Sequence, residues 1–191
     1  MKKFLFLLSF LSLFFVIGCG NDEPISKVPY EVIKSEKAGA NRLKISIHVK
    51  EKVSKDQLQK LADQVFTDQK KTATPFTALF LNFYDNPVYV GQFTPSLGQA
   101  DFLPNGDIAS ATTATPGDYK NFKGKYIELK EKDWKKQPTP EEAKIATACF
   151  EWLAKQPPSD DDIENQYAKD NKLDPAALKE TLNKVLVWTS F

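Results

Sequence analysis

The amino-acid sequence predicts an α+β protein, in which an antiparallel sheet carries one packing helix and is followed by three C-terminal helices. Three observations lead to this prediction. Apolar and polar residues alternate from Asn41 to Lys50, which is typical of a strand with one buried face. A capped amphipathic pattern begins at Ser54. Helix-start signals recur from Thr139 onward.

The first strand and helix are the clearest elements. Within Asn41 to Lys50, Leu43, Ile45, Ile47 and Val49 point to one face, and Lys44, Ser46, His48 and Lys50 point to the other. Ser54 and Gln57, three residues apart, form a capping box. The apolar stripe that follows must pack on the sheet; it consists of Leu58, Leu61, Ala62, Val65 and Phe66.

Further strands are expected after Pro75. Phe76 to Tyr84 is apolar on both faces, which indicates a central strand. Asp85-Asn86-Pro87 predicts a turn, and Val88 to Phe93 a returning partner strand in a hairpin. The Pro-, Gly-, Thr- and Ser-rich segment Thr94 to Phe122 holds two short possible strands, and a last one is expected later; they are Gln99 to Leu103, Ile108 to Thr112 and Tyr126 to Leu129.

The tail is predicted to be helical. Thr139, with Pro140 at N1 and Glu142 at N3, begins a helix that runs to about Lys155. A second helix is expected from Ser159 with Asp162, and a third from Asp174-Pro175. We therefore expect an α+β domain at 30–130 and a helical subdomain packed on it at 131–191.

The N-terminus is typical of an export signal. Lys2 and Lys3 precede Phe4 to Ile17, whose 14 residues are too few to span a membrane but suit a signal peptide. The stretch ends in Val16-Ile17-Gly18-Cys19, which resembles the lipobox of bacterial lipoproteins. That resemblance implies a signal peptide at 1–18, cleavage before Cys19 and lipidation of Cys19 with acyl chains such as palmitate. Residues 19–29 then form the lipidated Cys and a flexible tether. An ordinary secretory signal with an incidental Cys is the alternative.

The lipoprotein resemblance also implies a location in the cell envelope. The protein is expected on the outer membrane of a Gram-negative cell or on the outer face of a Gram-positive cytoplasmic membrane. Gly20 stands where the best-known inner-membrane retention signal has Asp. From Tyr30 to Tyr119 the order of elements is similar to small bacterial domains of unknown function in lipoproteins and phage-related proteins, a likeness that implies no activity.

Charge and composition exclude several classes of protein. The net charge of +1 becomes −1 when Lys2 and Lys3 are removed, which argues against nucleic-acid partners. One His and two Cys argue against most zinc sites and against a disulfide framework, so no cofactor or metal is expected. Cys149 lies among apolar residues at helical spacing and is expected to be buried and unreactive.

No catalytic residue is predicted. His48 falls on the polar face of its strand, where it is expected to be exposed rather than to act as a base. The motifs G-x-S-x-G and H-E-x-x-H and a Gly-rich phosphate loop do not occur. The acidic cluster Asp160-Asp161-Asp162 with Glu164 favours helix capping over calcium binding. The last two helices resemble a helix-turn-helix in length, but a helical hairpin packed on the sheet is favoured.

The segment Thr94 to Phe122 is the predicted binding surface, with Phe93, Phe102, Tyr119 and Phe122 as its aromatic residues. The alternative is that this segment forms irregular edge strands that fill the core. We expect a non-catalytic binding or interaction module with an envelope protein as a possible partner. Two alternatives remain. A motif-poor, hydrolase-like envelope enzyme would show two converging titratable groups. A structural assembly factor of an envelope complex would show a contiguous exposed apolar patch.

Overall fold

The computed structural model describes residues 28–39, 41–72, 74–156 and 163–190. It confirms the α+β class, with a five-stranded sheet, one helix on it and three helices at the C-terminus. The strands follow one another across the sheet in chain order. They are β1 (Tyr30–Lys37), β2 (Arg42–Val49), β3 (Ala78–Tyr84), β4 (Gly98–Pro104) and β5 (Phe122–Ile127). The predicted signal peptide, Cys19 and most of the tether lie outside the described residues.

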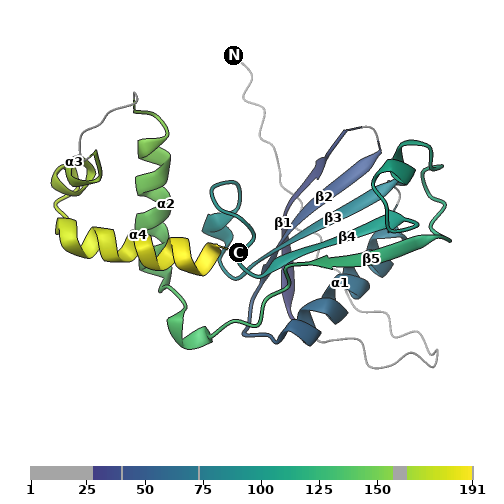
Figure 1. Cartoon of the computed structure of the whole chain (residues 1–191), viewed down its shortest axis with the longest axis horizontal. Coiled ribbons are helices and arrows are strands. Elements are labelled where there is room, and N and C mark those ends of the chain that lie inside the picture. Colours follow the sequence, from purple (N-terminus) through teal and green to yellow (C-terminus); the bar gives the residue numbers. More distant parts are fainter. Residues whose placement is uncertain (1–27, 40, 73, 157–162, 191) are drawn as a thin grey trace, which may run out of the picture.

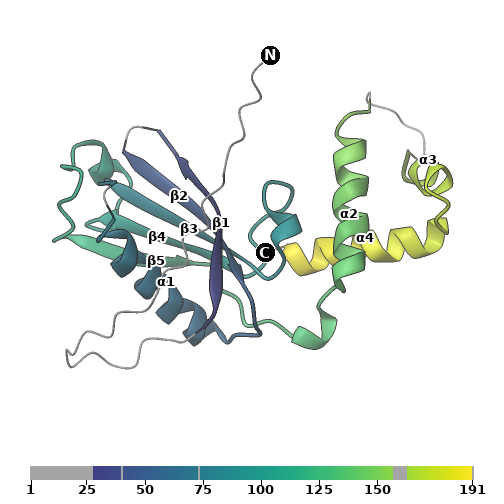
Figure 2. The same ribbon diagram turned by 180° about the vertical axis from the view of Figure 1, so that it is seen from behind.

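All neighbouring strands are antiparallel except β2 and β3, which are parallel. The exception arises because α1 (Lys55–Gln69) connects the end of β2 to the start of β3. It returns the chain to the end of the sheet at which β2 also begins, so the two strands run in the same direction. Helix α1 lies along one face of the sheet (Figures 1 and 2). Its buried residues meet the apolar residues of β2 and β3, and the largest core cluster forms there.

The predicted start of α1 is confirmed. The Ser54 hydroxyl accepts a hydrogen bond from the Gln57 amide at 3.2 Å, and the Gln57 side chain accepts one from the Ser54 amide at 2.8 Å. Two orphan amides at the helix end are thereby satisfied. The strand predicted at Asn41 to Lys50 and the central strand predicted at Phe76 to Tyr84 correspond to β2 and β3.

The predicted hairpin at Val88 to Phe93 is wrong. Asn86 caps a 3-10 turn, η1 (Pro87–Tyr89), and β3 pairs instead with β4. The alternation at Val88 is misleading because Tyr89 is fully buried in the helical part of the protein rather than in the sheet. Ile108 to Thr112 is likewise no strand: it leads into the 3-10 turn η2 (Ala109–Thr112), whose Ala111 packs on the end of the sheet.

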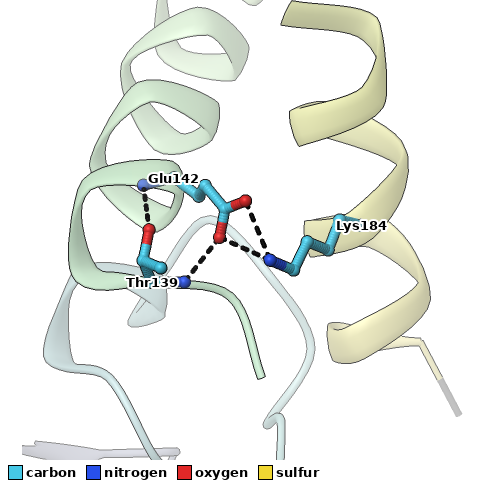
Figure 3. A network of polar contacts seen from close by, with 3 residues as sticks. All are labelled: Thr139, Glu142 and Lys184. Atoms are coloured by element: carbon cyan, nitrogen blue, oxygen red, sulfur yellow. Dashed lines mark hydrogen bonds and ion pairs between the residues drawn. The ribbon is translucent and has the colours of Figure 1, made fainter. Parts of the chain in front are cut away.

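The C-terminal helices are α2 (Pro140–Leu153), α3 (Ile163–Asp170) and α4 (Pro175–Thr189). The caps predicted at Thr139 and Asp174 are both present, whereas the predicted start of α3 at Ser159 and Asp162 lies outside the described residues. Lys184 of α4 contacts Glu142, the capping-box residue of α2, at 2.7 Å (Figure 3). None of the described helices is long and apolar enough to cross a membrane.

The helical part joins the sheet through a polar hub at Asp85, directly after β3. The Asp85 carboxylate accepts hydrogen bonds from Gln137 Nε2 at 2.8 Å, from Trp188 Nε1 at 3.0 Å and from the Ser96 hydroxyl. These donors come from the connection before α2, from the end of α4 and from the segment before β4. The segment after β3 accordingly lies between the sheet and the C-terminal end of α4 in both views (Figures 1 and 2).

Candidate binding groove

The face of the sheet opposite α1 carries polar side chains in register across the strands. Lys34 pairs with Ser46, Ser46 with Asn82, and Asn82 with Gln99. Because side chains alternate between the two faces of a sheet, these four residues stand in one row on the helix-free face. A β-bulge between Val32 and Lys34 makes this possible, because it shifts the register of β1 by one residue.

A groove of about 550 Å³ opens over this row. The sheet forms its floor and the segment from Val90 to Pro95 forms its wall. Ligand pockets for small molecules have volumes of about 300–1,000 Å³. The groove is therefore large enough for a ligand of several rings.

Three polar groups form the floor of the groove. Asn82 is 7% exposed as a residue, and its side-chain amide, which makes no hydrogen bond within the described residues, is open to the groove. Gln99 lies beside it, half-buried, with its amide likewise unpaired within the described part of the chain. Burial raises the pKa of the Tyr84 phenol, and a hydrogen bond with Ser46 partly offsets that effect. The floor is thus polar but uncharged at neutral pH.

Charged residues lie at one end of the groove. Lys34 and Glu36 of β1 form an ion pair with each other, and Lys44 of β2 stands beside them. The pKa of Glu36 is lowered, first by its hydrogen bond with Lys34. Glu36 is the one carboxylate among the residues that line the groove.

Of the four aromatic residues predicted to bind, the structure places one at the groove and three elsewhere. Phe93 lines the groove, and its ring is held edge-on by Tyr89 at 5.4 Å and Phe150 at 5.3 Å. The other three lie in an aromatic cluster on the α1 side of the sheet, with Phe66 and Phe76; they are Phe102, Tyr119 and Phe122. Phe102 is only 3% exposed there. The four residues therefore do not form one surface.

The reactive side chains of the described chain do not converge on the groove. Cys149 is buried in the helical cluster as predicted, and burial raises its pKa to about 11. His48 is half-buried rather than exposed, on the helix-free face opposite Tyr84. Lys132 has its pKa lowered to about 8 by burial, but its ammonium donates to the Trp188 carbonyl and lies 4.7 Å from that ring's centroid. Across the described ranges, no three His, Cys, Asp or Glu residues are grouped to hold a metal ion.

Sequence reasoning missed the floor of the groove. The signal that could have found it is Asn82, a carboxamide within the apolar run Phe76 to Tyr84. A polar residue at the centre of a buried strand requires a partner, either in the protein or outside it. The start of the predicted binding segment does contribute, because Thr94, Pro95 and Gln99 all line the groove.

Comparison with known proteins gives no further assignment. No protein-family model, no curated protein and no solved structure matches this chain.

Proposed function

We propose that this chain is a cell-envelope lipoprotein whose folded part is a non-catalytic binding module held on a membrane through lipid on Cys19. The working surface is the groove on the helix-free face of the sheet, with Phe93 and the Val90 to Pro95 segment as its wall. The observation that carries the proposal is the groove itself, whose floor presents unpaired amides rather than reactive groups.

The two alternatives find less support. An enzyme needs converging acid, base or nucleophile groups, and the groove offers a single carboxylate, Glu36, already paired with Lys34. An assembly factor needs a contiguous apolar patch. The exposed large apolar residues of the described chain are divided among β1, the segment before η2, and α4; they are Val32, Ile33, Ile108, Leu186 and Val187.

The anchor is tested by changing each cysteine in turn. We expect Cys19→Ala to move the protein from the membrane fraction to the soluble fraction, because the acyl chains that supply the membrane affinity are lost. Cys149→Ala is the matched control and should leave the protein on the membrane, since that thiol is buried in the helical core. A Cys19→Ala protein that still sediments with membranes contradicts the anchor.

The binding module is tested in the native envelope with a photo-cross-linking amino acid. We expect the residue placed at Gln92, an exposed position on the wall of the groove, to capture a specific product. The same residue at Glu180, exposed on α4 and away from the groove, is the control. Products that are identical at the two positions, or no product at Gln92, would count against the groove as the working surface.

A further inference from the structure

We propose that the groove binds a neutral, hydroxyl-rich ligand, a saccharide, through hydrogen bonds from Asn82 and Gln99 and contact with the Phe93 ring. This inference rests on the proposed function, because it names the ligand class of the same groove. Its first support is Asn82, which lines the groove, is 7% exposed as a whole residue and makes no side-chain hydrogen bond within the described residues. Its amide atoms stay open to the groove, because the buried unpaired side-chain atoms of the described chain are Gln64 Oε1 and the Tyr89 hydroxyl. An amide open to the groove can exchange its water for the hydroxyl of a ligand, and each such hydrogen bond contributes about 0.5–1.5 kcal/mol net.

The second support is the match between hydrogen-bonding groups. A carboxamide both donates and accepts, and so does a hydroxyl. Asn82 and Gln99 face each other on adjacent strands, and Ser46 with its hydroxyl stands on the other side of Asn82. Neighbouring strands are about 4.7–4.9 Å apart. The floor is therefore a line of amide and hydroxyl groups at regular spacing, which suits a ring that bears several hydroxyls.

The charges of the groove favour a neutral ligand. Its two lysines, Lys34 and Lys44, share the end of the groove with Glu36, which pairs with Lys34. None of the lining residues at the opposite end, where Asn82, Gln99 and Phe93 lie, is charged. Beyond Gln99 on the same face of the sheet, Asp101 of β4 stands opposite Lys125 of β5, so those two charges offset each other. An anionic ligand such as a phosphate would need several unpaired cations or a cluster of amide N–H groups. A neutral polar ligand requires neither.

The position of the groove favours a saccharide over a peptide. Extended peptides bind sheets by pairing with the free backbone of an edge strand. The groove reaches the edge strand β1 only at the end formed by Lys34 and Glu36. The rest of it lies over β2, β3 and β4, whose backbone groups are engaged with neighbouring strands on both sides. Recognition there must be made by side chains. Phe93, fixed by Tyr89 and Phe150, adds an aromatic ring on which the C–H groups of a sugar can pack.

The test is calorimetric titration of the full chain, purified in a detergent without sugar headgroups. The probes are maltotriose, N,N′,N″-triacetylchitotriose and the neutral peptide (Gly-Ser)₃. We expect one of the trisaccharides to bind more tightly than about 1 mM. Asn82→Ala should weaken that binding about tenfold, because one satisfied amide is lost. Asn183→Ala, which removes an exposed carboxamide on α4, is the matched control and should bind like the parent.

Thermal unfolding without ligand separates a binding role of Asn82 from a structural one. Because the amide has no partner in the described protein, Asn82→Ala should leave the melting temperature unchanged or raise it. A lower melting temperature together with weaker binding would show that Asn82 supports the fold, and it would overturn the assignment.

The remaining outcomes distinguish this inference from the proposed function. Binding of the peptide and of neither trisaccharide would overturn the saccharide in favour of a peptide ligand. Binding of no probe, with a specific cross-link still captured at Gln92, would overturn the saccharide and leave the binding module standing. Binding of no probe and no cross-link at Gln92 would overturn both.

Discussion

Gly98, the first residue of β4, lies where the backbone of Glu128 and Leu129 closely approaches that of β4. Its φ of +112° lies in the region that L-residues with side chains rarely adopt. A Cβ atom built there would lie 2.3 Å from the carbonyl oxygen of Glu128. Glu128 itself has a φ of 54° and directs the chain from β5 toward the helical part. At this close approach the atoms that an added Cβ would meet belong to the backbone of Glu128 and Leu129, so no change of side-chain rotamer can make room for it.

We expect Gly98→Ala to lower the free energy of unfolding by more than about 3 kcal/mol, or to prevent folding, because strain and a backbone clash add. Gly91→Ala is the matched control: its φ is +88°, but nothing lies within 4 Å of the added Cβ. That control should cost only the backbone strain, about 1–2 kcal/mol. Urea denaturation followed by circular dichroism measures both. Equal losses in the two variants would show that the approach at Gly98 is not tight.

At the scale of single residues, the sequence predicts the features that depend on residues a few positions away. The burial of Cys149 follows from its apolar neighbours at helical spacing, and the cap at Ser54 follows from the residue three positions on. The need for glycine at position 98 is invisible in the sequence, because it depends on Glu128, thirty residues away. For the same reason the sequence does not show that Asn82 and Gln99 meet.

Among the elements, α2 and α4 are fastened to each other where α2 begins. The Glu142 carboxylate accepts a hydrogen bond from the Thr139 amide at 2.6 Å and contacts the Lys184 ammonium of α4 at 2.7 Å (Figure 3). One side chain therefore completes the capping box of its own helix and binds the neighbouring helix. The hydrogen bond with Lys184 is the main cause that lowers the pKa of Glu142 below its usual value.

A double-mutant cycle tests this contact. Glu142→Gln keeps an acceptor for the cap but removes the charge, and Lys184→Met removes the cation. Because both side chains are about one-third exposed, with 27% and 35% of their surface accessible, we expect a coupling free energy of only about 0.5–1 kcal/mol at pH 7. The stabilisation is present above the unfolded pKa of about 4.3 and is lost as the pH falls through the lower pKa of the folded state. The coupling should therefore vanish in acid.

The control for this cycle is Glu141→Gln, which changes the exposed neighbouring carboxylate in the first turn of α2. It should show no coupling with Lys184→Met. Coupling of the same size from Glu141, or coupling of Glu142 that persists in acid, would show that a general helix-end effect and not the ion pair is being measured.

The elements that the sequence predicts correctly are those whose signals are short-range. The starts of α2 and α4 are predicted correctly because the residues that cap each helix, from the N-caps Thr139 and Asp174 onward, lie within four positions of one another in the sequence. The hairpin at Val88 fails because the choice of a partner strand is not local. Tyr89 packs in the helical cluster, and β3 pairs instead with β4, which begins at Gly98, ten residues after Val88. Strand β1 gives little signal, since most of its side chains are exposed at the edge of the sheet.

At the scale of the whole molecule, the sheet and the helical part are held together by the Asp85 hub. Its carboxylate is acceptor-only and receives donors from Ser96, Gln137 and Trp188. The Trp188 side chain also packs against Trp134 at 5.7 Å, and Trp188 as a whole is only 5% exposed. One half-buried carboxylate therefore binds side chains from three segments, at the junction of the two parts.

We expect Asp85→Asn to cost about 2–3 kcal/mol, because the amide turns one acceptor into a donor that faces other donors. Asp133→Asn is the matched control: its Oδ1 accepts a single 3.2 Å hydrogen bond from the Lys135 amide, and an asparagine can do the same. Chemical denaturation measured by circular dichroism and by tryptophan fluorescence compares the two variants. Similar losses of unfolding free energy in the two variants would mean that the hydrogen bonds of Asp85 do not stabilise the contact between the sheet and the helical part.

Phe93 has a consequence for the whole chain, because its ring lines the groove and also packs on Phe150 of α2. Whatever fills the groove must press on a wall that the helical part supports. By thermodynamic reciprocity, an occupant that steadies this wall also steadies α2, and anything that loosens α2 weakens the hold on the occupant by the same factor. Amide hydrogens of α2, remote from the sheet, would then exchange more slowly when the groove is full. Hydrogen exchange in the helices would in this sense report whether the groove is occupied.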